Sequence, residues 1–277
     1  MAALARLATG AGALLALAGG HVSAAPLDDA RAALGRGDFA TELTIVVPLA
    51  KAGNSEAQTL LGWAYESGNG VPLDYTTAAS WYRKAAENNF IEAEYRLSSL
   101  YEHGTGVAQS WKDAFYWCQK AAEQGNSLVE NRLGVLYLEG HGVPASPLQA
   151  LHYFEESAIQ GEASGQYDLG LAYERGQGVA QNYAQAASWY KKAADQAYPY
   201  AFANLAVLYA TGRGVPQDYA RAYIFFSLAA SELTGDQAER VVRGRDLAAA
   251  TLNSAQLAQA KNEIAAWTLQ HTTAAER

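Results

Sequence analysis

One short segment of the sequence carries residues that could perform covalent catalysis. Ser188-Trp189-Tyr190-Lys191 matches S-x-x-K, in which a lysine follows a nucleophilic serine, as in serine β-lactamases and penicillin-binding proteins. Those enzymes also carry S-D-N and K-T-G segments, and neither occurs anywhere in the chain. G-x-S-x-G and P-loop motifs are missing too. The main prediction is therefore a protein without catalytic residues, and a periplasmic ligand-processing hydrolase of the penicillin-binding or β-lactamase type is the alternative.

Histidine and cysteine could bind a metal or form a covalent bond, but their spacing favours neither. Four histidines follow residue 24, and no two are four residues apart: His103, His141, His152 and His271. A metal site needs a ligand set at usable spacing, so no metal and no cofactor are expected. The single cysteine, Cys118, has no partner for an intramolecular disulfide, and pairing with another chain is one alternative for it. Burial is favoured, because 36-residue steps lead from Cys118 to a column of aromatic residues: Tyr82, Phe154, Tyr190 and Phe226.

The sequence repeats every 36 residues between Gly53 and about Glu232. G-x-G-V occurs five times, beginning at Gly68, Gly104, Gly140, Gly176 and Gly212. A leucine column repeats with it, at Leu61, Leu97, Leu133, Leu169 and Leu205, and a tyrosine column follows four residues later. Spacings of three, four and five residues between the columns predict helix faces and not strands. Each unit is therefore expected to form helix A (near 55–67 in the first copy), a turn, and helix B (near 75–88).

The turn between the two helices has a recurring chemistry. In each copy helix B is preceded by a residue whose side chain can cap a helix: Asp74, Ser110, Ser146, Asn182 and Asp218. The first glycine suits the left-handed residue that closes helix A, and the second allows another sharp turn. The residue between the glycines differs in every copy, which predicts that it points to water and makes no shared contact. A phosphate-binding loop is not expected, because such a loop follows a strand and this one follows a helix.

The combined pattern resembles a known repeat family. L-G-x-x-Y-x-x-G-x-G-V, followed by a capped A-x-x-W-[YF]-x-x-A-A helix, is similar to the Sel-one-like repeat (SLR) family, a subclass of tetratricopeptide-like repeats. The third copy departs most from it, with Ser157 in place of the first alanine of the final pair. The resemblance implies an all-α fold, a right-handed α/α superhelix of five 36-residue helix-turn-helix repeats with capping helices at both ends. It also implies a non-enzymatic adaptor or scaffold, of a kind often exported or membrane-associated in bacteria.

Certain disulfide-rich relatives of these repeats have been linked to penicillin binding. This link is a second argument for a catalytic role of the S-x-x-K motif. Those relatives carry cysteines in pairs, whereas this chain has one cysteine. Ser188 also falls in a repeat column, shared with Ser80, Tyr116, His152 and Ile224. The column indicates a surface position on helix B and not a catalytic one.

The repeat boundaries divide the chain into four predicted parts. Residues 1–24 form a signal peptide, and residues 25–53 form an N-terminal capping helix pair in which Asp38 is a cap. Residues 54–233 hold the five repeats. The period fails after them, and residues 234–277 are expected to form C-terminal capping helices, near 236–250 and 255–270, and a tail. Asn253 or Ser254 caps the last of these helices.

The first 24 residues have the features of a secretory signal peptide. Arg6 is their only charged residue, an apolar run extends from Leu7 to Ala18, and Val22-Ser23-Ala24 is a small-residue cleavage pattern. Cleavage is expected after Ala24 or Ala25, and an N-terminal helix of the folded protein is the alternative. The apolar run is too short to span a bilayer, and no later stretch is long and apolar enough. The expected location is periplasmic or secreted, without a membrane span.

The net charge of the chain limits the classes of partner that it could bind. The formal net charge is −8, the isoelectric point is near 5.2, and no run of lysine or arginine stands out. Nucleic acid is therefore not an expected partner. A protein or peptide partner, bound in a concave groove by an envelope regulator or adaptor, is the expected function.

The resemblance also predicts which residues would touch such a partner. In related tetratricopeptide repeats, helix A residues two before, two after and five after the leucine column point into the concave face. Carried over to this chain, the candidates are Thr59, Trp63, Glu66, Tyr95, Glu102, Asn131, Tyr167, Leu171 and Glu174. Tyr95 and Tyr167 lie in one row, two repeats apart, and are expected to line the same channel. Val135, Leu138 and Val207 occupy the same rows, and packing against neighbouring repeats is an equal alternative for them.

Overall fold

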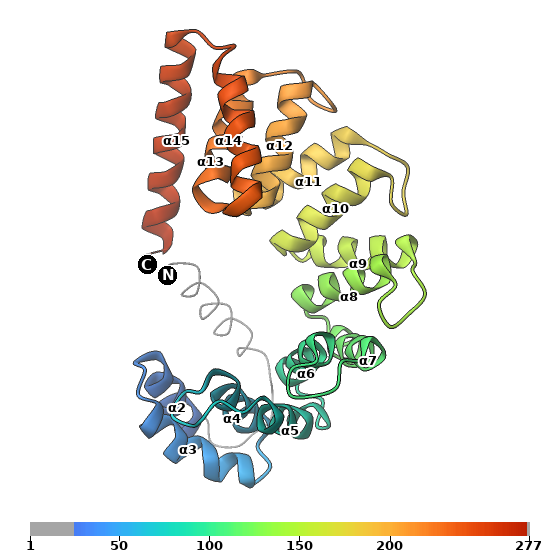
Figure 1. Ribbon diagram of the computed structural model, residues 1–277, viewed down its shortest axis with the longest axis vertical. Coiled ribbons are helices and arrows are strands. Elements are labelled where there is room, and N and C mark those ends of the chain that lie inside the picture. Colours follow the sequence, from blue (N-terminus) through green and yellow to red (C-terminus); the bar gives the residue numbers. More distant parts are fainter. Residues whose placement is uncertain (1–24, 276–277) are drawn as a thin grey trace. The chain divides into compact units, whose positions relative to one another are not determined.

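The computed structural model describes residues 25–275, in which every regular element is an α-helix (Figure 1). The helices before the third repeat are α2 (Ala25–Gly35), α3 (Phe39–Lys51), α4 (Ser55–Ser67), α5 (Tyr75–Ala86), α6 (Ile91–His103) and α7 (Trp111–Ala122). Those that follow are α8 (Ser127–Glu139), α9 (Pro147–Ile159), α10 (Ala163–Arg175), α11 (Tyr183–Asp195), α12 (Pro199–Thr211), α13 (Tyr219–Glu232), α14 (Gly235–Ala249) and α15 (Ser254–Ala275). The predicted signal peptide, residues 1–24, lies outside the described residues.

The helices fall into two compact units. The first extends to Val129 and takes in Gly140–Pro144, and the second comprises Glu130–Glu139 and the chain from Ala145 onward. Helix A of the five repeats is α4, α6, α8, α10 and α12, and helix B is α5, α7, α9, α11 and α13. The boundary between the units therefore falls inside one helix A, that of the third repeat.

All five predicted helix B caps are confirmed. The side chain of each capping residue accepts a hydrogen bond from a backbone N–H in the first turn of its helix, as Asp74 does from Thr76 and Thr77. Asp38 caps α3 in the same way, and Asn253 accepts from the backbone N–H of Gln256 at the start of α15. These contacts satisfy donors that a helix start otherwise leaves unpaired, so the polar residues of the turns set where the helices begin.

The first glycine of each G-x-G-V segment closes helix A as predicted. Gly68 has a φ of 70°, and its N–H donates to the carbonyl of Ala64. The equivalent glycines of the other repeats have φ values between 67° and 73°. Residues with a Cβ avoid this left-handed conformation, which explains why glycine recurs at the position.

Glycine recurs at the second position for a different reason, because successive repeats approach each other closely there. A Cβ on Gly142 would lie 2.1 Å from the carbonyl oxygen of Trp111, and one on Gly214 would lie 2.2 Å from the carbonyl carbon of Tyr183. Gly106 and Gly178 meet the first residue of the preceding helix B in the same way. The turn of one repeat therefore packs directly on the N-terminus of helix B in the repeat before it.

The residue between the glycines makes contacts that the sequence analysis did not predict. His141 stacks on the Trp111 ring, with centroids 3.7 Å apart and planes inclined by 15°. The Arg213 guanidinium lies 5.6 Å from the ring centroid of Tyr183. The prediction that this residue points to water is wrong for these two copies, because the close turn holds its side chain against the first residue of the preceding helix B.

The core of the first unit is built from small and large residues on facing helices. Ala78, Ala85 and Tyr82 of α5 are buried together with Leu97 of α6. Alanines let the helix backbones approach, and burial of a leucine or aromatic side chain contributes about 1.5–3 kcal/mol. Cys118 is a buried free thiol, as its column predicted.

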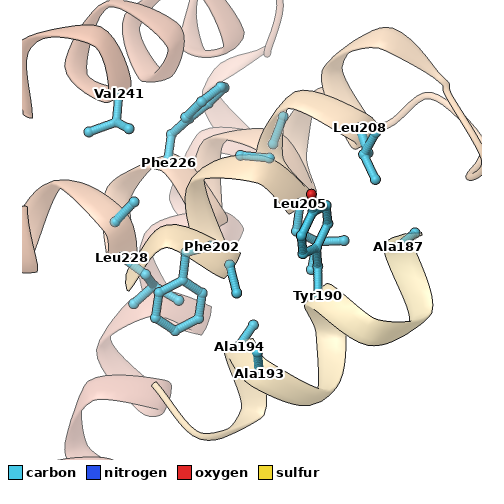
Figure 2. Close-up of a cluster of buried hydrophobic side chains, with 14 of the residues drawn as sticks. Ala187, Tyr190, Ala193, Ala194, Phe202, Leu205, Leu208, Phe226, Leu228 and Val241 are labelled. Carbon is cyan, nitrogen blue, oxygen red and sulfur yellow. The ribbon is translucent and has the colours of Figure 1, made fainter. Parts of the chain in front are cut away.

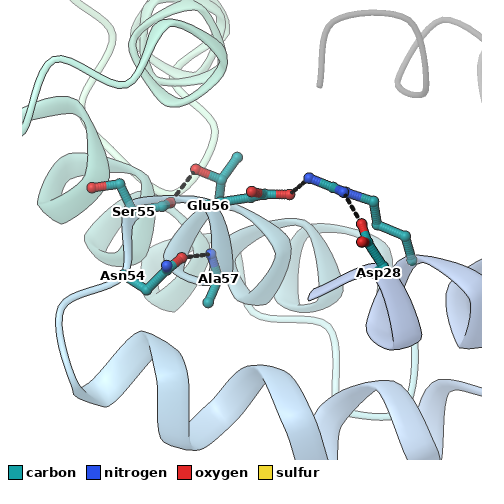
Figure 3. A network of polar contacts seen from close by, with 7 residues as sticks. Asp28, Asn54, Ser55, Glu56 and Ala57 are labelled. Atoms are coloured by element: carbon teal, nitrogen blue, oxygen red, sulfur yellow. Dashed lines mark hydrogen bonds and ion pairs between the residues drawn. The ribbon is translucent and has the colours of Figure 1, made fainter. Parts of the chain in front are cut away.

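The leading helices of the first unit attach to the first repeat through apolar and polar contacts. Val46 and Ala50 of α3 are buried with Leu61 of α4. Arg31 of α2 bonds both Asp28, at 2.6 Å, and Glu56 of α4. Figure 3 shows this network beside the Asn54 cap of α4, whose side chain accepts from the backbone N–H of Ala57. The pair α2–α3 thus covers the apolar face that the first repeat would otherwise expose.

The core of the second unit is drawn in Figure 2. Tyr190 of α11, Phe202 and Leu205 of α12, Phe226 of α13 and Val241 of α14 are buried together. Gly244 of α14 lies against the Phe226 ring, where a Cβ would come within 2.6 Å of it. Helix α14 therefore packs mainly against α13 and covers the core of the last repeat there.

Helix α15 covers a different face of α13. Two apolar residues of α13, Ile224 and Leu228, occupy columns that are mostly polar in the first four repeats. The column of Ile224 contains Ser80, Tyr116, His152 and Ser188, and the column of Leu228 contains Lys84, Lys120, Glu156 and Lys192. The two apolar residues face α15 across a cavity of about 640 Å³ that Trp267 also lines. Trp267 packs edge-on against Phe202, with ring centroids 5.2 Å apart. The change from polar to apolar residues in the last repeat thus coincides with the helix that shields them.

Candidate functional site

The candidate site comprises the three predicted rows of helix A residues, described for each unit separately and called the helix A face of that unit below. In the first unit, Thr59 is buried, and its hydroxyl donates to the carbonyl of Ser55 in its own helix. Trp63 is half-buried and packs against the Tyr82 cluster. Tyr95 and Glu102 of α6 are also half-buried. Thr59 therefore offers no side-chain surface to a partner, whereas the other side chains are partly accessible.

A hydroxyl–carboxylate pair joins the helix A face of the first unit to its core. The Tyr82 hydroxyl donates to Glu66 at 2.5 Å. Arg96 lies 3.9 Å from the same carboxylate and bonds Glu92 at 2.8 Å. Burial and the charge of Glu66 raise the pKa of Tyr82 well above its usual value. The phenol therefore stays protonated and keeps Glu66 in place.

In the second unit, the predicted residue of α8 is hidden. Asn131 is buried, and its Nδ2 donates to Asp168 of α10 at 3.0 Å. Its Oδ1 is buried and has no hydrogen-bond partner among the described residues. Asn131 therefore positions Asp168 instead of forming an open surface itself, which corrects its predicted place in the groove.

The remaining predicted residues of the second unit lie along α10. Tyr167 and Leu171 are half-buried and pack against the Phe202 cluster. Glu174 accepts a hydrogen bond from the buried Tyr190 hydroxyl, which also accepts from Asn204 Nδ2 at 3.1 Å. Three apolar residues of the same rows had two equal alternatives, a place in the groove or packing against neighbouring repeats. Val207 is 42% exposed, whereas Val135 and Leu138 pack against the cluster around Phe154.

Three tyrosines meet at the N-terminal ends of α10 and α12 and form what we call the tyrosine cluster. Its members are Tyr167, Tyr198 and Tyr200, with ring centroids 5.2 Å, 5.8 Å and 6.0 Å apart. Tyr200 is the most accessible, at 39% exposed, and the other two rings are half-buried. Tyr198 precedes α12 and makes no side-chain cap bond, so its ring is not needed to start the helix.

Sequence reasoning found Tyr167 but missed the other two members. Tyr198 lies in the turn before helix A and Tyr200 in its first turn, outside the three rows carried over from related repeats. The segment Tyr-Pro-Tyr at 198–200 was the sequence feature that could have indicated these two tyrosines. Proline at the first helical position fixes the backbone there, and this sets the two flanking rings close to each other and to Tyr167.

The cluster carries negative charge at its edge. Burial raises the pKa of Asp168 to about 6, and the bond from Asn131 and the charge of Arg175 oppose that rise. Burial and the Asp168 charge raise the pKa of Tyr167 to about 12 and that of Tyr198 above its usual value. The phenols of Tyr167 and Tyr198 are therefore neutral at pH near 7, and Asp168 is the charged residue with the largest effect on both.

The serine and lysine considered for catalysis lie on helix B of the fourth repeat. Ser188 and Lys191 are both exposed on α11. The neighbouring Lys192 lies over the Trp189 ring, with its Nζ 3.5 Å from the centroid. Within residues 25–275, no group of three or more His, Cys, Asp or Glu residues could hold a metal ion. No helix in that range is long and apolar enough to cross a membrane.

The comparisons with known proteins agree with the repeat architecture. The Sel1 repeat model matches residues 55–90, 91–126, 127–162, 163–198 and 199–232. A Sel1 repeat protein from Oxalobacter formigenes is similar at 30% identity, with a TM-score of 0.69 over 75% of this chain and 85% of that one. The protein c5321, a protective antigen with an SLR fold from uropathogenic Escherichia coli, is 29% identical, with a TM-score of 0.71 over 89% of this chain and 57% of its own.

No curated protein is significantly similar to the chain in sequence. The five matched segments nevertheless cover well over half of it. Repeats of this type generally mediate protein interactions. The chain therefore belongs to the Sel1 repeat family and has the all-α repeat fold of that family.

Proposed function

We propose that the protein is an exported, non-enzymatic scaffold that binds an extended segment of a partner protein on its helix A face. The observation that carries the proposal is the tyrosine cluster, which is partly exposed and lies outside the columns that repeat in the core. Tyrosines supply a large contact area at a low entropy cost and are enriched among the residues that dominate binding energy.

The chemistry of the chain supports binding in preference to catalysis. Ser188 and Lys191 are both exposed on helix B, and S-D-N and K-T-G segments are missing from the sequence. Two buried carboxylates, Glu94 and Glu130, share a repeat column and accept from glutamine amides, and the third, Glu42 of α3, has no hydrogen-bond partner among the described residues. A hydrolase would need nucleophile, base and oxyanion donors within reach of each other.

Export rests on the signal-peptide features of residues 1–24 and suits a role in the bacterial envelope as regulator or adaptor. Mass spectrometry of the protein from an exporting host tests this part. A mature N-terminus at Ala25 or Pro26 supports export, and an intact Met1 on cytoplasmic protein contradicts it.

Site-specific photocrosslinking tests the binding face. A photoreactive phenylalanine analogue at Tyr200 should capture a partner in the periplasm, and the same probe at Ser188, exposed on helix B of the same unit, should not. The captured protein is then purified and measured against the wild type and Tyr200→Ala. Equal capture at both positions, or wild-type affinity of Tyr200→Ala, contradicts the proposed face.

A further inference from the structure

The tyrosine cluster presents aromatic rings beside a partly buried carboxylate. The three rings lie within 6.0 Å of each other, and the charge of Asp168 acts on both Tyr167 and Tyr198. Ring faces attract cations within about 6 Å of their centroids. The chain uses this contact on helix B, for example with Lys84 over Trp81 at 3.9 Å and Lys192 over Trp189 at 3.5 Å.

The charges around the cluster are unbalanced. The carboxylates that act on its rings belong to Asp168, Glu174 and Glu162. The one cation that acts on them among the described residues is Arg175, which is exposed at the end of α10. An anionic ligand would be repelled, and a purely apolar one would cover Asp168 without pairing it, which is costly. The charges therefore favour a cationic ligand.

Hydrogen-bond capacity distinguishes between the two common cations. Asn131 donates to Asp168, and its Oδ1 is a buried acceptor without a partner among the described residues. A guanidinium has five N–H donors in a plane, so it can stack on a ring while bonding both oxygens of a carboxylate. A lysine ammonium has three donors and no planar face. The Asp168 carboxylate and the ring faces together suit arginine better.

We propose that the tyrosine cluster and Asp168, which Asn131 holds in place, form a subsite for an arginine side chain of the bound partner segment. The inference rests on the proposed function, because it names the chemistry by which that face recognises its partner. The guanidinium lies on a ring of the cluster and donates to the Asp168 carboxylate, and the rest of the segment continues along α10.

Binding of a defined probe tests the subsite without a partner. The full-length protein, labelled with ¹⁵N, is titrated with N-acetyl-arginine amide and with N-acetyl-citrulline amide, which has the same shape and no charge. Saturable shifts are expected at the amides of Tyr167, Tyr198 and Tyr200, with binding of the citrulline probe about tenfold weaker. Equal binding of the two probes, shifts centred on another region, or no binding overturns the proposal.

Matched variants locate the effect. Asp168→Asn keeps a group that can bond Asn131, and Tyr200→Ala removes an accessible ring, so each should weaken arginine binding by about tenfold while the thermal melt stays close to wild type. Tyr219→Ala removes a comparably exposed tyrosine on α13 and should bind like the wild type. Wild-type binding by Asp168→Asn would contradict the subsite.

The two proposals fail in different ways. If the photocrosslinked partner still binds when its arginines are replaced by citrulline or glutamine, the face is right and the arginine subsite is wrong. If the arginine probe binds at the cluster but Tyr200 captures no partner, the subsite stands and the scaffold function is wrong.

Discussion

Glu174 on the helix A face accepts a hydrogen bond from the Tyr190 hydroxyl in the core, and Glu66 and Tyr82 form the same pair three repeats earlier. Both pairs join residues 16 positions apart. A buried phenol needs a partner for its O–H, and the carboxylate provides one at the boundary between core and surface. The repeat thus couples a core column to a surface row.

The third and fifth repeats lack both partners of this pair, whereas the second repeat has Glu102 in the row and Cys118 in the core column. Where the core column has Phe154, the surface row has Leu138, and where it has Phe226, the row has Ala210. Neither of these phenylalanines carries a hydroxyl, and neither row position carries a carboxylate. In the first, third, fourth and fifth repeats the two positions therefore change together, because an unpaired buried hydroxyl at this boundary is unfavourable.

This coupling predicts a non-additive pair of substitutions. Tyr190→Phe should lower the free energy of unfolding by about 1 kcal/mol, because Glu174 and Asn204 both lose a partner. The double variant Tyr190→Phe with Glu174→Leu, which copies the third repeat, should recover part of that loss. Urea unfolding of the single and double variants measures the coupling. Additive losses would show that the bond carries no interaction energy.

A surface tyrosine provides the control for that cycle. Tyr183→Phe removes a hydroxyl that accepts only from the exposed Gln181 side chain, so its effect should stay within about 0.5 kcal/mol.

A buried glutamate predicts how stability depends on pH. Glu94 is buried and accepts from Gln124 Nε2 at 2.6 Å, and burial raises its pKa from 4.5 to about 7. A carboxyl whose pKa is raised by folding stabilises the folded state fully below its unfolded pKa, and that contribution is lost as the pH rises through about 7. Glu94→Gln should therefore gain stability relative to the wild type above pH 7, by about 3 kcal/mol from linkage.

The sequence itself supports glutamine as the replacement. The same repeat column has Gln58 and Gln166, which are buried and bond backbone carbonyls. Urea unfolding of the wild type and Glu94→Gln at about pH 5 and about pH 8 measures the difference. Glu87→Gln, at an exposed position, should show no such dependence. A constant difference between wild type and Glu94→Gln across the pH range would contradict the assignment.

The turn predicts a ranking of three substitutions in the third repeat. Gly142→Ala should cost the most, about 2 kcal/mol or more, because its Cβ would overlap the backbone oxygen of Trp111. Gly140→Val should cost about 1 kcal/mol or more from its left-handed backbone. His141→Ala should cost about 0.5–1 kcal/mol through loss of the Trp111 stack. Thermal melts that place His141→Ala above Gly142→Ala would contradict the repeat-to-repeat packing.

The sequence predicted the repeat well, because its signals are local. The leucine column, the five caps and the first glycines all act within one helix pair, so the 36-residue period reveals them. The second glycine and His141 act between successive repeats, and the period alone does not show which element they touch. Their misassignment has that physical cause.

The candidate site was predicted less completely for a similar reason. Tyr167 was found because its row is defined within helix A, whereas Tyr198 and Tyr200 reach it from the start of the next helix A. Thr59 and Asn131 were placed in the groove from the same row but are buried. Their polar groups bond a helix carbonyl and Asp168, and these partners permit burial. Side-chain partners across helices are not visible in a column of residue types.

The covering helix α15 predicts the effect of restoring a typical repeat residue. Leu228 of α13 is buried where the fourth repeat has the exposed Lys192. Leu228→Lys should lower the free energy of unfolding by several kcal/mol, about 3, because an ammonium would lose water beneath α15. Lys192→Leu is the reverse change on an uncovered helix B and should alter stability by less than about 1 kcal/mol, mainly through loss of the contact with the Trp189 ring. A wild-type melt for Leu228→Lys would show that α15 does not cover this face in solution.

The charge of Asp168 predicts how binding of the arginine probe depends on pH. Its pKa of about 6 means that the free protein carries the carboxylate above that pH and the neutral acid below it. A guanidinium pairs with the charged form, so affinity for N-acetyl-arginine amide should rise by about tenfold between about pH 5 and pH 7. Over that range the ionised fraction of a carboxyl with this pKa rises by about the same factor. The citrulline probe should show little change over the same range, and Asp168→Asn should make the arginine probe equally insensitive. The titrations that locate the subsite, repeated at three pH values, measure this. An arginine affinity that stays constant, or that falls with rising pH, would mean that Asp168 does not contact the bound cation.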